Sequence, residues 1–105
     1  MIGSQPAFWV YILRCADGLY YVGSYRGSDI DVRVGEHNSG KYPGAWTFRR
    51  RPVSLVWAQE FSSVSDAVAF ERQLKGWSRR KKEAVIRGDW DQLPALSKRR
   101  SSSKG

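Results

Sequence analysis

A small set of side chains along the chain has types and spacings that could do chemistry. Tyr11 and Tyr21 stand in separate stretches rich in aromatic residues, and Arg33 and His37 lie at i, i+4 of a predicted helix. Glu71 falls within the apolar stripe of another predicted helix, where a carboxylate is costly unless it is paired. A tyrosine, whose pKa is roughly 10, is a poor base unless a nearby cation lowers that pKa. The set therefore offers two phenol hydroxyls, a guanidinium, an imidazole and a carboxylate that needs a partner.

Each of these residues also has an ordinary structural interpretation. Strand tyrosines usually pack within a sheet, and an arginine–histidine pair at i, i+4 usually lies on a solvated helix face. Glu71 could reach solvent at the edge of its stripe or pair with an arginine. The sequence contains no cysteine pair for zinc, no P-loop, no dinucleotide fingerprint and no nucleophile-elbow serine. No motif links Cys15 with the single histidine, so a Cys–His nucleophile is disfavoured.

The elements that must position these side chains predict one α+β domain. Aromatic and β-branched runs predict strands, while serine or aspartate caps and following glycines bound the helices. The expected architecture is a small three-stranded antiparallel sheet flanked by helices. In the order β-β-α-β-α-α, the predicted elements cover residues 8–15, 19–24, 30–37, 53–61, 64–75 and 78–88.

The turn at residues 16–18 (ADG) decides how the first two strands pair. A two-residue Asp17-Gly18 turn would send Tyr11 and Tyr21 to opposite faces of the sheet. A three-residue loop, with Gly18 in the left-handed conformation, pairs Tyr11 with Gly23 and puts both tyrosines on one face. We favour the three-residue loop.

The composition is that of a small basic protein. Eighteen Lys and Arg against 10 Asp and Glu give a formal net charge of +8. Such a charge attracts nucleic acid through counterion release, although solubility alone or an anionic membrane surface are alternative explanations. We find no basic amphipathic helix suited to a membrane surface, and the longest apolar run, residues 7–13, is too short to span a bilayer. The single cysteine fits a reducing cytosol, so a cytoplasmic location is expected.

Taken in order, the motifs resemble those of the GIY-YIG nuclease superfamily, most closely its small single-domain bacterial members. The resemblance extends over most of residues 8–87. Its motifs are VYI (10–12), YVG (21–23), Arg33 with His37, HNSGK (37–41), RRPVSLVW (50–57) and ERQLKGWSRRKKEAVI (71–86).

This resemblance implies metal-dependent hydrolysis of phosphodiester bonds. By resemblance, Tyr21 would deprotonate or orient the attacking water, and Tyr11 would help to position the water or the phosphate. Arg33 would neutralise charge on the phosphate oxygens, and His37 would assist the phosphate or a proton transfer. Glu71 would hold one divalent cation, Mg²⁺ or Mn²⁺. A guanidinium and a metal ion supply the charge stabilisation that this reaction needs.

The sequence departs from the family pattern at three places. Trp9 replaces the glycine of the first motif, and its indole could narrow the space beside Tyr11. The stretch from Gly23 to Arg33 is longer than usual, with residues 25–27 as the extra length. Some relatives carry an asparagine after the glutamate helix, whereas the only asparagine here is Asn38.

Basic clusters interleaved with Trp46, Phe48 and Trp77 are the candidate nucleic-acid contacts, unless Trp46 and Trp77 close the core instead. We expect a DNA endonuclease, acting on single strands or on repair and recombination intermediates, with no small-molecule cofactor. The alternatives are a non-catalytic or partner-dependent nucleic-acid-binding module and an RNA-cleaving nuclease. The expected boundaries are an N-terminal extension at 1–7, the nuclease domain at 8–90 and a basic, disordered tail at 91–105. The candidate contacts are Lys41, Arg49, Arg50, Arg51, Lys75, Arg79 and Arg80.

Overall fold

The computed structural model describes residues 7–91, in a chain that divides into two compact units at residues 1–75 and 76–105. The predicted element order is confirmed, with one short 3-10 helix added. Residues 92–105 of the predicted tail and residues 1–6 of the predicted N-terminal extension lie outside the described residues. The elements are β1 (Ala7–Arg14), β2 (Tyr20–Gly27), α1 (Ile30–Ser39), η1 (Phe48–Arg50), β3 (Ser54–Phe61), α2 (Val64–Lys75) and α3 (Arg79–Arg87).

The sheet is antiparallel in the order β2-β1-β3, so β1 is central and β2 is an edge strand. Tyr11 pairs with Gly23 and Leu13 pairs with Tyr21. Gly18 has a φ of 86°, a left-handed conformation that glycine adopts without strain. The three-residue turn is therefore confirmed, and it places Tyr11 and Tyr21 on the same face of the sheet.

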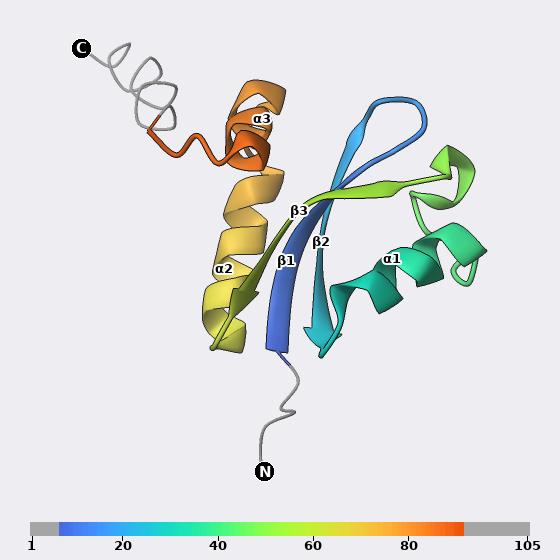
Figure 1. The fold of residues 1–105 in the computed structure, drawn as a ribbon, viewed down its shortest axis with the longest axis horizontal. Helices are drawn as coiled ribbons and strands as arrows, with labels where there is room; N and C mark the ends of the chain where they lie inside the picture. The colour runs from blue at the N-terminus through green and yellow to red at the C-terminus, as the bar shows by residue number, and fades with distance from the viewer. Residues whose placement is uncertain (1–6, 92–105) are drawn as a thin grey trace. The chain divides into compact units, whose positions relative to one another are not determined.

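The two faces of the sheet are covered by different helices of the first unit (Figure 1). On the face of Tyr11 and Leu13, Ile30 of α1 completes a buried cluster. On the other face, the Phe70 ring of α2 lies with its centroid 5.8 Å from that of Trp57. Strand alternation produces this division, because neighbouring residues of a strand point to opposite faces.

Local capping bounds the helices, and α1 ends at Ser39, two residues beyond the predicted end at His37, because Gly40 provides its C-cap. The Asp29 carboxylate accepts a hydrogen bond from the Asp31 N–H at 2.9 Å, and Gly40, with a φ of 78°, ends α1. The Ser63 hydroxyl accepts a hydrogen bond from the Asp66 N–H at 3.3 Å at the start of α2. These caps satisfy backbone groups that the helix itself leaves unpaired.

Two local predictions are wrong. The sequence predicts a loop at residues 25–29, but β2 continues to Gly27, because β1 begins at Ala7 and its first three residues pair with residues 25–27. The helical spacing of Val64, Ala67, Phe70 and Leu74 predicts one apolar stripe on α2, yet the Val64 side chain is 54% exposed, since it lies in the first turn of the helix.

The second unit contains α3. The Ser78 hydroxyl accepts a hydrogen bond from the Lys81 N–H at 3.2 Å, and Gly88, with a φ of 72°, ends the helix. The helix runs from Arg79 to Arg87, and the two end residues of the predicted range, 78–88, are its caps. No helix within residues 7–91 is long and apolar enough to cross a membrane.

Candidate active site

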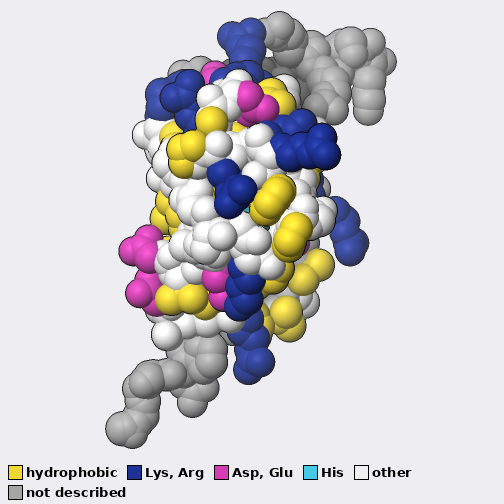
Figure 2. Space-filling model, turned by 90° about the vertical axis from the view of Figure 1, so that its right-hand side faces the viewer, with side chains coloured by type: hydrophobic (Ala, Val, Ile, Leu, Met, Phe, Trp, Pro, Cys, Tyr) yellow, Lys and Arg dark blue, Asp and Glu magenta, His cyan; other side chains and the backbone are white. Residues whose placement is uncertain are grey.

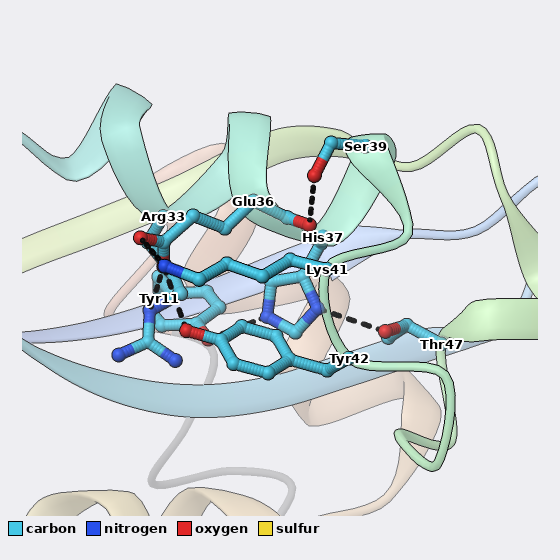
Figure 3. Close-up of polar contacts among 8 residues, drawn as sticks. All are labelled: Tyr11, Arg33, Glu36, His37, Ser39, Lys41, Tyr42 and Thr47. Atoms are coloured by element: carbon cyan, nitrogen blue, oxygen red, sulfur yellow. Dashed lines mark hydrogen bonds and ion pairs between the residues drawn. The ribbon is translucent and has the colours of Figure 1, made fainter.

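A chain of hydrogen bonds runs from Tyr11 through His37 to Thr47. The Tyr11 hydroxyl lies 3.1 Å from Nε2 of His37, and the Thr47 hydroxyl lies 2.8 Å from Nδ1 of the same ring (Figure 3). All three side chains are buried. Because both ring nitrogens have a partner, the imidazole is held in one orientation.

The backbone of Gly23 leaves room for this arrangement. A Cβ atom at position 23 would lie 2.5 Å from the Tyr11 hydroxyl and 2.8 Å from a ring carbon of Tyr21. No side chain fits at such distances, so the glycine of the YVG motif is required by the two tyrosines that lie over it.

Tyr21 is the partly exposed tyrosine of the pair. Its ring centroid lies 6.3 Å from that of Tyr11 and 5.4 Å from that of His37. Trp46 stacks on Tyr21 at 6.0 Å with an interplanar angle of 19°, and the Arg50 guanidinium lies 3.9 Å from the Trp46 ring centre. The Trp46 ring therefore packs against Tyr21 and Arg50, and its side chain is still 44% exposed.

Burial sets the protonation of the hydrogen-bonded chain. It raises the pKa of Tyr11 well above the usual tyrosine value; Tyr21 and the Glu71 carboxylate add to that rise, and the Arg33 guanidinium opposes it. Burial, followed by the positive charge of Arg33, lowers the pKa of His37 below 6.5. At neutral pH Tyr11 is therefore a neutral hydroxyl beside a neutral imidazole.

Arg33 lies in a network centred on Glu36 (Figure 3). The Glu36 carboxylate lies 3.5 Å from Nε of Arg33 and 3.2 Å from Nζ of Lys41, and it accepts a hydrogen bond from the Tyr42 hydroxyl at 3.1 Å. The hydrogen bond from Lys41 is the main reason why the pKa of Glu36 is lowered. Arg33 is thus oriented from its own helix, through a carboxylate that the following loop also contacts.

Three residues of this region were not predicted from the sequence: Glu36, Tyr42 and Thr47. Glu36 carried a usable signal, because it lies three residues after Arg33 on the predicted helix. Tyr42 and Thr47 stand in a stretch that reads only as a turn-rich loop, and the return of that loop to His37 is a long-range contact.

Glu71 lies on α2, the helix that packs on the other face of the sheet from α1. Its carboxylate pairs with Nζ of Lys75 at 3.1 Å, and its side chain is 18% exposed. Within residues 7–91 no hydrogen bond or ion pair joins Glu71 to Tyr11, Arg33 or His37, although its charge acts on the Tyr11 hydroxyl.

The donor set around Glu71 fits a sparsely coordinated hard cation. Its carboxylate oxygens are ligands that Mg²⁺ and Mn²⁺ accept, and such ions retain waters and take further ligands from substrate phosphate. No group of three His, Cys, Asp or Glu that could enclose a metal occurs in the described part of the chain. Glu71 could therefore supply one carboxylate ligand to a divalent cation whose other ligands are waters and substrate phosphate.

Most of the predicted nucleic-acid contacts already have intramolecular partners. Arg50 pairs with Asp17 at 3.2 Å, and Arg51 donates to the Phe48 carbonyl at 2.8 Å. Lys41 and Lys75 pair with Glu36 and Glu71 as described above, whereas Arg49 is exposed. Arg79 and Arg80 belong to the second unit.

On the side that carries α1, Lys and Arg side chains lie among hydrophobic ones (Figure 2).

Two departures from the family pattern have structural explanations. The indole of Trp9 donates a hydrogen bond to the Gly27 carbonyl at 2.9 Å, which ties the central strand to the end of β2. The side chain of Asn38 donates to the Val53 carbonyl at 2.9 Å and accepts from the Val53 N–H at 2.7 Å. Asn38 therefore joins α1 to the start of β3.

Comparison with known proteins identifies the class of domain. Residues 7–84 match the GIY-YIG catalytic domain, so the chain belongs to the GIY-YIG family. This family indicates an endonuclease, a hydrolase whose substrate is nucleic acid.

The individual relatives carry family names only. The chain is 42% identical over 79 residues to a UPF0213 protein of Syntrophus aciditrophicus, covering 75% of this chain and 88% of that protein. It is 43% identical over 78 residues to a UPF0213 protein of Halobacterium salinarum, covering 73% and 96%. The solution NMR structure of the protein EF2693 from E. faecalis is 31% identical, with a TM-score of 0.54, and covers 83% of this chain and 90% of that one. The α+β fold predicted from the sequence is shared with this structure.

Proposed function

We propose that this chain is a divalent-metal-dependent endonuclease that hydrolyses phosphodiester bonds in DNA, acting on single strands or on repair and recombination intermediates. One observation carries the proposal. His37 is hydrogen-bonded to the Tyr11 hydroxyl, and the charges of Arg33 and Glu71 both act on that same hydroxyl. Tyr11 of β1 and His37 of α1 thus meet in one hydrogen bond, and the ring centroid of Tyr21 of β2 lies 5.4 Å from that of His37, so three elements bring their side chains to one place, as a single reaction centre requires.

The proposed roles follow from exposure and charge. Tyr21 is partly exposed and faces His37, so it is the tyrosine that can deprotonate or orient an attacking water. Tyr11 is buried and stays protonated, which suits a positioning hydroxyl rather than a base. Arg33 supplies a permanent positive charge for the phosphate oxygens as charge builds up in the transition state.

Glu71 is the residue that would hold the cation, Mg²⁺ or Mn²⁺. When bound, such an ion neutralises phosphate charge and makes a coordinated water more acidic. Lys75, which pairs with the same carboxylate at 3.1 Å, lies next to this ligand and adds positive charge beside the phosphate.

The net charge of +8 supports a polyanionic substrate in general, and DNA is the substrate that we propose. The protein is incubated with labelled single-stranded DNA, duplex DNA and RNA, in Mg²⁺, in Mn²⁺ and in EDTA. Glu71→Gln and Tyr21→Phe are assayed beside the wild type. Their matched controls are Glu83→Gln, which also breaks an i, i+4 ion pair, and Tyr20→Phe, which alters the neighbouring tyrosine of the same strand.

The expected result is metal-dependent cleavage of DNA that both site variants lose by a factor of about 100 or more and that both controls retain. Cleavage of RNA in preference to DNA would contradict the proposed substrate. Salt-sensitive binding without cleavage under any metal condition would contradict the proposed activity and favour a nucleic-acid-binding module.

A further inference from the structure

A pocket of about 260 Å³ opens beside the proposed active site, within the first unit. It is lined by the beginning of β1, the second half of β2 and the first two turns of α2, together with Arg33 of α1. Within residues 7–91, β2 is an edge strand, so no further strand of that part of the chain lies beside it. Arg33 lines the pocket and is also a residue of the proposed active site, so the two adjoin at this side chain.

Several apolar side chains that line the pocket are exposed to solvent. Val64 and Val68 are 54% and 40% exposed, and both contribute to the lining from α2. Trp9 contributes to it from β1, and its indole N–H is already bonded to the Gly27 carbonyl. Apolar groups gathered around a hollow indicate a ligand with an apolar face.

Two arginine–aromatic pairs border the hollow at the edge of the sheet, one on each face, because Tyr25 and Arg26 are neighbours in β2. The Arg33 guanidinium lies 4.8 Å from the centre of the Tyr25 ring, and the Arg26 guanidinium lies 5.7 Å from the centre of the Phe8 ring. All four residues line the pocket. Flat aromatic and guanidinium surfaces are those on which unstacked nucleobases pack, and the positive charges suit the phosphates that flank a base.

We infer that this pocket binds one unpaired nucleobase of the substrate, next to the phosphate that Arg33 contacts; the inference rests on the proposed function. A nucleotide chain that places a phosphate at Arg33 brings an adjacent base to Tyr25 and to the valines of α2. A paired base inside a duplex is stacked on both sides and cannot enter. The pocket thus selects single-stranded or locally unpaired nucleic acid.

Binding is measured by fluorescence anisotropy in EDTA, so that affinity is separated from cleavage. The probes are a short oligothymidylate, an abasic chain with the same number of phosphates, and a blunt DNA duplex. Val68→Phe fills the pocket from an exposed helix position. The matched control is Val32→Phe, because Val32 is 49% exposed on α1 and does not line the pocket.

The wild type should bind the oligothymidylate about five- to tenfold more tightly than the abasic chain. Val68→Phe should lose that difference while its binding of the abasic chain and of the duplex is unchanged, and Val32→Phe should match the wild type. In ¹H–¹⁵N spectra of the wild type, the indole signal of Trp9, assigned with Trp9→Phe, should shift with the oligothymidylate and not with the abasic chain.

Equal affinity for base-bearing and abasic chains, or full retention of the difference by Val68→Phe, would overturn the pocket. A change in oligomeric state caused by Val68→Phe would also overturn it, because the hollow would then be a contact between copies. Failure of the two proposals is distinguishable: base-dependent binding without cleavage contradicts only the nuclease, and cleavage with base-independent binding contradicts only the pocket.

Discussion

The hydroxyl of Tyr11 and Nε2 of His37 lie 3.1 Å apart inside the protein, between residues that belong to different elements. The contact joins the central strand to α1. His37 is neutral at this position because burial lowers its pKa, so one of its nitrogens donates and the other accepts. The hydroxyls of Tyr11 and Thr47 can each donate or accept, so together they satisfy either neutral form of the ring, and the orientation of the imidazole depends on a threonine hydroxyl as well as on Tyr11.

Replacing Thr47 by valine should misalign His37 without changing the volume of the core. The variant leaves Nδ1 of His37 buried without a partner, which costs about 1–3 kcal/mol of stability. We expect kcat to fall about tenfold or more with KM little changed, because the imidazole does not touch the bulk of the substrate. Thr47→Ser retains the hydroxyl and should restore most of both losses in urea unfolding and in cleavage assays. Equal kcat values for the valine and serine variants would contradict this positioning role.

Gly23→Ala should displace both tyrosines. The added methyl group would lie 2.5 Å from the Tyr11 hydroxyl and 2.6 Å from the ring carbon that bears it, so the ring must move. Overpacking of this kind costs about 1–3 kcal/mol, and cleavage should fall with it. The control is Gly35→Ala, because nothing lies within 4 Å of its added methyl group and it stands on the exposed side of α1. That variant should gain up to about 1 kcal/mol in thermal unfolding, and a comparable loss at both positions would refute the steric explanation.

The strand register and the helical spacing that position the site residues could be predicted from the sequence. The side chains that contact those residues from the loop after α1 could not. Turn length and a positive-φ glycine determine the Tyr11–Gly23 register, and both are local properties that the residues at 16–18 encode. The i, i+4 spacing of Arg33 and His37 is equally local. The contacts of Thr47 and Tyr42 depend on how the loop after α1 returns over the sheet, which no periodicity describes. Glu71 was identifiable as misplaced, but its salt bridge with Lys75 could equally have formed on a solvated face.

The basic residues show the same limit. A run of arginines at 49–51 suggests a phosphate-binding surface, yet Arg50 and Arg51 hold Asp17, Trp46 and the end of α1 in place. The composition shows how much positive charge the chain carries. It does not show which of these side chains are already bound to carboxylates and carbonyls of the protein itself.

Glu36→Gln should separate substrate binding from turnover. Glutamine can still accept a hydrogen bond from Tyr42, but it no longer neutralises Arg33 and Lys41. We expect KM for nucleic acid to fall about two- to fivefold at low salt, and kcat to fall as well, because Arg33 loses one of its anchors. Glu60→Gln removes the same charge from an exposed position on β3 and serves as the control. If both variants shift KM equally, the effect is one of net charge and the special role of Glu36 is refuted.

The stability of the protein should depend on pH through His37. In the folded protein the pKa of His37 is lowered by burial and then by Arg33, partly opposed by Glu36, while in the unfolded chain it returns to 6.5. The unfolded chain therefore binds more protons below pH 6.5, and the free energy of unfolding falls as the pH falls through that value. Above it, this histidine contributes no pH dependence. The slope from one such group is at most about 1.4 kcal/mol per pH unit.

Urea unfolding of the wild type and of His37→Gln, followed by tryptophan fluorescence between about pH 8 and pH 5, measures this contribution. Glutamine keeps hydrogen-bonding groups in the core and cannot titrate. The difference in stability between the two proteins should be constant above pH 7 and should shrink as the pH falls below 6.5, because only the wild type must keep a buried imidazole neutral. Two parallel stability curves over the whole range would mean that His37 titrates normally in the folded protein, and that Tyr11 and Thr47 do not enclose it as tightly as their hydrogen bonds indicate.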